Sequence, residues 1–148
     1  MAGAVTFLSL AACGGGGGGG ADDDTAAIPT STEGAGAATV NVAIGETGKR
    51  MYMRLSQPSV AAGSVTFIIT NEGIMEHEFI VLGTDKEAGD LAVDGRFAEE
   101  PNVIDEAEGI FGGSTVTLTV ELEPGHYALI CNEPRHYQQE MFADLNVT

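Results

Sequence analysis

Residues 115–120 read Thr115-Val116-Thr117-Leu118-Thr119-Val120, a strict alternation of hydroxyl and aliphatic side chains. Successive side chains of a β-strand point to opposite faces, so this pattern predicts a strand over residues 115–122 with one buried and one exposed face. Six other short segments, set apart by Gly, Pro or Asn, are also typical of strands: 39–44, 51–55, 65–71, 77–82, 127–132 and 141–147. Together they predict an all-β domain over residues 39–148, a Greek-key antiparallel β-sandwich.

The segment 84–109 does not follow this pattern. Its acidic residues far outnumber its two basic residues, Lys86 and Arg96. Insertions of this length between strands are commonly functional or mobile. We expect a solvated excursion with one short helix, and an acidic docking surface is the alternative interpretation.

Composition excludes several classes of protein. The chain has 148 residues, with 6 Lys+Arg against 22 Asp+Glu, and a formal net charge of −16. That charge argues against nucleic-acid binding, which needs a basic surface. The 2 Cys are too few for a disulfide framework, and the 3 His are too few for an enzyme with several copper or zinc centres. No apolar run reaches the roughly 18 residues of a membrane-spanning helix.

The first 38 residues predict an export signal and a linker. Residues 4–12 form an apolar run, the size of a signal-peptide core, although no basic residue precedes Lys49 and the signal therefore looks incomplete. The run ends in Leu10-Ala11-Ala12-Cys13, which resembles the lipobox of bacterial lipoproteins and implies cleavage after residue 12 and acylation of Cys13. Residues 13–38 are rich in Gly and Asp, so we expect a disordered linker.

Two further stretches carry metal-ligand side chains. One reads Cys131-Asn-Glu-Pro-Arg-His136-Tyr-Gln-Gln-Glu-Met141. Four residues separate Cys131 from His136, and four more separate His136 from Met141. The other ends in His77, just after an Asn-Glu-Gly turn. A thiolate and two imidazoles in a plane, with a weak thioether, suit a copper ion that cycles between Cu(II) and Cu(I).

These stretches resemble the cupredoxins, the small blue-copper electron-transfer proteins, over roughly residues 65–148. The resemblance implies one type 1 copper ion bound by His77, Cys131 and His136, with Met141 as the axial ligand, and a one-electron carrier that is not an enzyme. It also implies an apolar patch around His136 through which electrons pass. We expect the neighbours of His136 in this patch to be Tyr137, Phe142 and Met75.

Three positions depart from the family's pattern. Arg135 precedes the loop histidine and Glu140 precedes the methionine, where relatives often have glycine. Glu78 follows the upstream histidine, where plastocyanin-like members carry an asparagine that braces the cysteine loop. All three departures place charge beside the predicted site without removing a ligand.

The resemblance and the lipobox together predict a monomer anchored to the extracytoplasmic side of a bacterial membrane. Its partners would be redox proteins, and the negative charge favours partners with basic docking surfaces. A different interpretation is a copper-homeostasis protein that stores or delivers Cu(I) through Met75 and His77, with Met51 and Met53 nearby, because thioethers favour Cu(I). A third is a metal-free sandwich used in adhesion or assembly.

Overall fold

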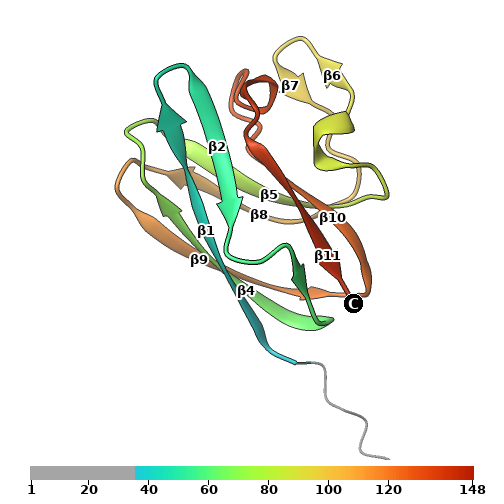
Figure 1. The fold of residues 1–148 in the computed structure, drawn as a ribbon. Helices are drawn as coiled ribbons and strands as arrows, with labels where there is room; N and C mark the ends of the chain where they lie inside the picture. Colours follow the sequence, from blue (N-terminus) through green and yellow to red (C-terminus); the bar gives the residue numbers. More distant parts are fainter. Residues whose placement is uncertain (1–35) are drawn as a thin grey trace, which may run out of the picture. The chain divides into compact units, whose positions relative to one another are not determined.

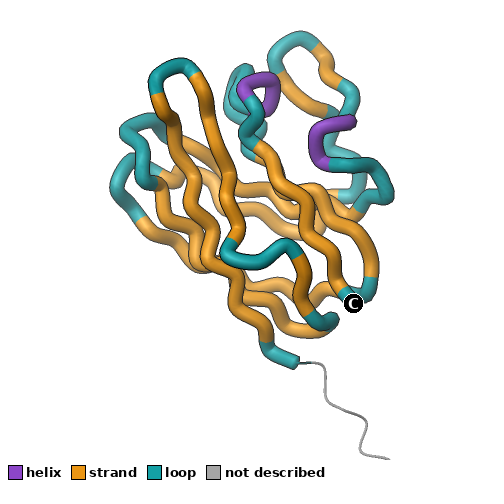
Figure 2. Tube along the Cα trace, in the orientation of Figure 1, coloured by secondary structure: helices purple, strands orange, loops and turns teal. Residues whose placement is uncertain are grey.

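The computed structural model describes residues 36–148, which form eleven strands and two single-turn 3-10 helices (Figures 1 and 2). The predicted signal peptide, Cys13 and nearly all of the predicted linker lie outside these residues. The strands are β1 (Ala38–Thr47), β2 (Arg50–Leu55), β3 (Ser59–Val60), β4 (Gly63–Asn71), β5 (His77–Gly83), β6 (Val93–Asp94), β7 (Phe97–Ala98), β8 (Val103–Ile110), β9 (Thr115–Leu122), β10 (Gly125–Ile130) and β11 (Phe142–Val147). The 3-10 helices are η1 (Ala88–Asp90) and η2 (Tyr137–Gln139).

All seven predicted strands are present, as β1, β2, β4, β5, β9, β10 and β11. The alternation of residue types in β9 corresponds to one buried and one outward face, as predicted. Val120 and Leu122 point into the core, while the outward Thr119 and Thr115 side chains contact threonines of β4. The all-β fold class is therefore confirmed. Within the part of the chain that the structure describes, no helix is long and apolar enough to cross a membrane.

The strands form two main sheets. The β1 sheet has the order β2-β1-β4-β9, and the β5 sheet has the order β3-β11-β10-β5-β8; β6 and β7 make a separate two-stranded ribbon. Both main sheets are mixed, since β1 pairs with β4 and β3 pairs with β11 in parallel. The prediction of antiparallel sheets was wrong for these two pairs, because residue alternation defines the faces of a strand and says nothing of its direction.

The core lies between the two sheets. It contains buried aliphatic and aromatic side chains from both, and the rings of Phe67 on β4 and Phe79 on β5 meet at a centroid distance of 5.1 Å. Cys131 and Met141 belong to the same buried cluster. The predicted metal ligands are therefore continuous with the packing that holds the sandwich together.

The insertion between β5 and β9 is structured, in contrast to the predicted solvated excursion. Ala88, Leu91 and Ala98 are buried against the outer face of the β5 sheet, where they cover Ile80 and Ile130. The second half of the insertion is β8, an edge strand paired antiparallel with β5. The short helix η1 agrees with the prediction, and the strand β8 does not.

Candidate metal centre

Three of the predicted ligand residues come together where the end of β10 meets the start of β5. His77 is the first residue of β5, Cys131 directly follows β10, and His136 lies in the loop between β10 and β11. The Cys131 Sγ lies 3.4 Å from His136 Nδ1 and 3.9 Å from His77 Nδ1, and the two Nδ1 atoms are 3.1 Å apart. All three side chains are buried. The three donor atoms therefore surround a common point inside the protein.

Met141, the fourth predicted residue, closes the same loop. The Cys131 N–H donates to the Met141 carbonyl at 3.0 Å, and the Met141 N–H donates to the His136 carbonyl at 3.3 Å. The Met141 side chain is fully buried in the core cluster that also holds Cys131. Because β10 and β11 are paired on both sides of the loop, its three candidate residues are held in one tight turn.

The two loop positions that depart from glycine have the backbone conformation that favours glycine. Arg135 has φ 73° and Glu140 has φ 72°, both in the left-handed region. This conformation costs roughly 1–2 kcal/mol for a residue with a Cβ. The loop thus keeps a path suited to glycine although the glycines are absent, which shows that its geometry is imposed by the surrounding contacts.

The structure corrects the predicted surface patch. Tyr137 is buried, and its hydroxyl donates to the Ala88 carbonyl at 2.7 Å and accepts the Leu91 N–H at 3.0 Å. Phe142 is half-buried against the Tyr137 ring. Both aromatics serve to fix the insertion to the loop. Met75 is exposed, as predicted for a patch residue.

Sequence reasoning missed the two side chains that organise the turn before His77. The buried Asn71 amide donates to the carbonyls of Met75 at 2.7 Å and Ile110 at 2.8 Å, and its oxygen accepts the Gly73 N–H at 2.9 Å. Glu46, on β1 of the opposite sheet, places a carboxylate oxygen 3.2 Å from His77 Nε2. The Asn-Glu-Gly turn was a signal for Asn71, whereas Glu46 lies too far along the chain for any local pattern.

Asn132, the residue after Cys131, connects the loop between β10 and β11 to the insertion between β5 and β9. The Asn132 side chain accepts the Ala98 N–H at 2.7 Å and donates to the Ala98 carbonyl at 3.0 Å. The N–H of Glu78, at the position where the resemblance led us to expect a bracing asparagine, points at the Cys131 sulfur at 3.5 Å. Asn132 thus ties the cysteine loop to the insertion, and the Glu78 N–H contacts the sulfur of the same loop.

Burial disfavours the charged forms of Cys131 and His136 in the absence of a cation. It raises the pKa of the Cys131 thiol to about 12, although the backbone N–H groups of Glu78 and Glu133 oppose the rise. Burial and the neighbouring His77 ring lower the pKa of His136 to about 4. Burial likewise raises the pKa of the Glu78 carboxyl to about 7. At neutral pH, His136 is therefore a neutral imidazole with a free lone pair, and Cys131 is a thiol.

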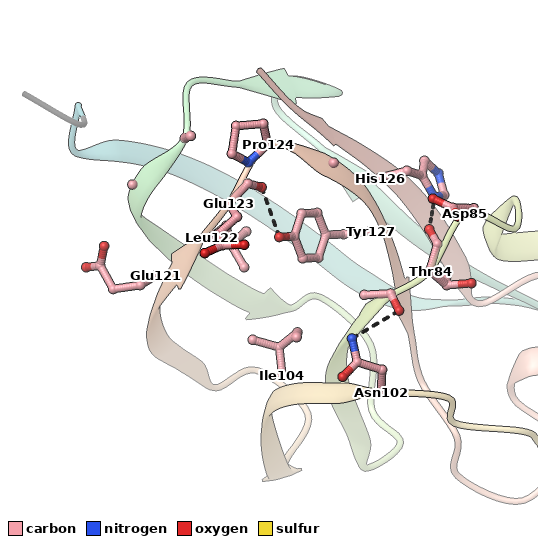
Figure 3. A pocket seen from close by; sticks show the side chains of 14 residues that line it. Thr84, Asp85, Asn102, Ile104, Glu121, Leu122, Glu123, Pro124, His126 and Tyr127 are labelled. Atoms are coloured by element: carbon pink, nitrogen blue, oxygen red, sulfur yellow. Dashed lines mark hydrogen bonds between the residues drawn. The ribbon is translucent and has the colours of Figure 1, made fainter. Parts of the chain in front are cut away.

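A second group of donors lies at the other end of β10. Figure 3 shows this region, where an open pocket includes His126 and Tyr127 in its lining. The half-buried His126 ring contacts the Thr84 carbonyl at 2.7 Å through Nδ1 and Asp144 at 3.0 Å through Nε2. Both ring nitrogens therefore have protein partners. This histidine is not part of the Cys131 cluster.

The similarity of this chain to known proteins lies in its fold. No protein-family model and no curated protein sequence matches the chain. Among solved structures, reduced auracyanin from the photosynthetic bacterium Roseiflexus castenholzii is 19% identical, with a TM-score of 0.55 over 78% of this chain and 99% of that one. Auracyanin A from Chloroflexus aurantiacus, described as a "blue" copper protein, is 26% identical (TM-score 0.51, 74% and 99%). Rusticyanin from Thiobacillus ferrooxidans is 20% identical (TM-score 0.52, 74% and 77%). The chain has a cupredoxin fold.

Within this cupredoxin fold the buried cluster occupies one end of the sandwich, where the turns before β5 and after β8 and β10 gather. Gly112, in the turn after β8, packs against Ile74 so tightly that a side chain there would collide with the Ile74 backbone. The large apolar side chains at this end, Ile74, Met75 and Phe111, are exposed. The cupredoxin domain therefore presents an apolar surface on the loops beside its buried thiol and imidazoles.

Proposed function

We propose that Cys131, His77 and His136 bind one copper ion, with Met141 as a weaker fourth ligand, and that the protein carries single electrons between redox partners. The observation that carries this proposal is the buried convergence of one thiol and two imidazole nitrogens within 3.9 Å of one another in a cupredoxin fold. A thiolate with two imidazoles in a trigonal arrangement is the donor set of blue-copper electron-transfer sites. When bound there, copper supplies a Cu(II)/Cu(I) couple.

The donor residues are prepared for a metal in different ways. The lowered pKa of His136 keeps this ring neutral near pH 7, so metal binding does not compete with an imidazolium proton, whereas Cys131 must release its proton to ligate. Burial excludes water from the three donors, and the loop hydrogen bonds limit their movement. Donors held in this way change position little when the charge at the site changes by one, which favours rapid electron transfer.

Exposed apolar residues next to the site are suited to contact a redox partner. Ile74 is 90% exposed and Phe111 is 62% exposed, on loops that touch each other at one end of the sandwich. Tyr137 is buried and takes no part in such a contact. We assign partner docking to the loops that carry Ile74, Met75 and Phe111, close to His77.

The experiment is copper loading of the full chain. Equilibrium dialysis against Cu²⁺ should give one tightly bound ion per chain, and voltammetry should show a single reversible one-electron wave. Cys131→Ser should remove the wave, while His126→Gln, at the other end of β10, should leave both stoichiometry and wave unchanged. A wild-type chain that binds no stoichiometric copper, or a wave that survives Cys131→Ser, contradicts the proposal.

The Cu(I)-delivery alternative gains nothing from the structure. Met51 and Met53, the additional thioethers that it would use, are packed in the core between the sheets. Met75 is the one methionine of that hypothesis that is exposed. The carrier is therefore the function that we adopt.

The proposal includes an extracytoplasmic location, with anchoring through an acylated Cys13 and partners that carry basic docking surfaces. Its support is the lipobox-like Leu10-Ala11-Ala12-Cys13 and the net charge of −16. In a bacterial host, palmitate labelling of the wild-type chain and its loss in Cys13→Ser would support the anchor. Absence of label in the wild type would contradict it.

A further inference from the structure

Glu46 links the two sheets at the candidate metal centre. It lies near the end of β1, in the sheet opposite His77, and its side chain is only 13% exposed. One carboxylate oxygen lies 3.2 Å from His77 Nε2. The other accepts the Ile74 N–H at 2.7 Å and the Met75 N–H at 3.3 Å. A single side chain thus holds both the ring of His77 and the turn that precedes it.

The hydrogen-bond chemistry of this contact fixes which nitrogen of His77 carries a proton. An ionised carboxylate only accepts hydrogen bonds, so Nε2 must be the donor. The Nδ1 atom, which faces Cys131 Sγ and His136 Nδ1, is then the nitrogen left to ligate.

We infer that Glu46 is a positioning residue of the copper centre, which keeps the proton of His77 on Nε2 and so presents Nδ1 to the metal. This inference rests on the proposed copper function. A carboxylate behind a ligating histidine fixes the ring and raises its basicity, and loss of such a partner typically costs 10–100-fold in metal affinity. A more basic ligand stabilises Cu(II) more than Cu(I), so Glu46 lowers the reduction potential.

The Glu46 carboxyl group packs directly against Gly73. Any side chain at Gly73 would collide with the Glu46 carboxyl group. The Gly73 N–H is held by Asn71, which keeps the glycine in place. The turn before His77 is therefore shaped around the carboxylate.

The first test needs no copper. In metal-free wild-type protein labelled with ¹⁵N, the His77 ring spectrum should show a proton on Nε2. An unprotonated Nε2 with the proton on Nδ1 alone would overturn the inference, whatever the protein's affinity for copper. Because this test uses the wild-type chain, it does not depend on any variant folding.

The second test is Glu46→Gln. His77 Nε2 and the Ile74 N–H contact different oxygens of Glu46, so glutamine in the same position would place its NH2 group, which only donates, against one of these two donors. We expect at least a tenfold loss of affinity for Cu²⁺ and a smaller loss for Cu⁺, which moves the reduction potential upward by about 59 mV for each tenfold difference. The matched control is Glu76→Gln, which removes the same charge from an exposed side chain next to His77 and should change affinity less than twofold.

The outcomes distinguish failure of the proposed copper function from failure of the role assigned to Glu46. A wild-type chain that binds no copper refutes the proposed function, and the ring spectrum still decides the position of the proton. A copper-binding Glu46→Gln variant with wild-type affinity and potential refutes the role of Glu46 alone. Equal shifts in Glu46→Gln and Glu76→Gln would also refute it, because they would assign the effect to net charge.

Discussion

Glu140→Gly should stabilise the protein, although it removes a side chain from the loop that closes the candidate metal centre. Glu140 has φ 72°, and among residues 36–148 it forms one ion pair, an exposed contact to Arg50 at 3.8 Å. Such exposed pairs contribute about 0–1 kcal/mol, and long ones such as this contribute least. Relief of the left-handed conformation is worth about 1–2 kcal/mol, from which about 0.5–1 kcal/mol is lost to the greater chain entropy of glycine.

The expected net gain is therefore about 0.5–1 kcal/mol, or a rise in Tm of about 2–4 °C for a domain of this size. Thermal unfolding of the metal-free protein, followed by circular dichroism, is the measurement. The control is Gly48→Ala, since Gly48 has φ +67° with open space around it, and this variant should lose about 1 kcal/mol. A lower Tm for Glu140→Gly would refute the assignment of strain to this loop, and a higher Tm for Gly48→Ala would refute the cost assigned to a side chain in the left-handed conformation.

Three more predictions concern the surroundings of the cluster. Binding of Cu²⁺ near pH 7 should release about one proton per ion, because the thiol of Cys131, with a pKa of about 12, is protonated before the metal binds. The affinity for Cu²⁺ should therefore rise with pH. Proton uptake, or no proton release, in weakly buffered titrations would count against the thiol as a ligand. Asn71→Ala should cost about 1–3 kcal/mol in urea unfolding, because it removes the buried donor to the Ile110 carbonyl. A cost below 1 kcal/mol would contradict this role. Tyr137→Phe should cost about 1–3 kcal/mol and speed amide exchange at Leu91, whose N–H loses its acceptor; unchanged exchange would show that the hydroxyl does not hold the insertion.

The sequence predicted the central strands because their two faces differ in polarity. It failed for β8, where Val103, Ile104 and the carboxylates that follow are nearly all exposed on an edge strand. Such a strand has no buried face to produce alternation, and its charges discourage further strand pairing. The same acidic residues led to the prediction of a solvated excursion, while Ala88 and Leu91, which cover the β5 sheet, are too few to give a periodic signal.

At the site, the expected convergence of His77, Cys131 and His136 depended on loop spacing, and the structure does bring these residues together. The prediction that Tyr137 lies in the exposed patch was wrong, because the sequence does not distinguish an exposed aromatic residue beside a ligand from a buried one that anchors the loop. Its burial depends on η1, which reaches it from the insertion. Glu46 could not be predicted, since its contact with His77 spans 31 residues and two sheets.

The visible absorption spectrum of the copper(II)-loaded full chain tests the central claim most directly. Ligation of Cu(II) by the Cys131 thiolate together with His77 and His136 predicts an intense blue colour that ascorbate bleaches and reoxidation restores, and that Cys131→Ser abolishes. A copper-loaded wild-type chain that stays colourless, or whose colour persists in Cys131→Ser, would contradict the account.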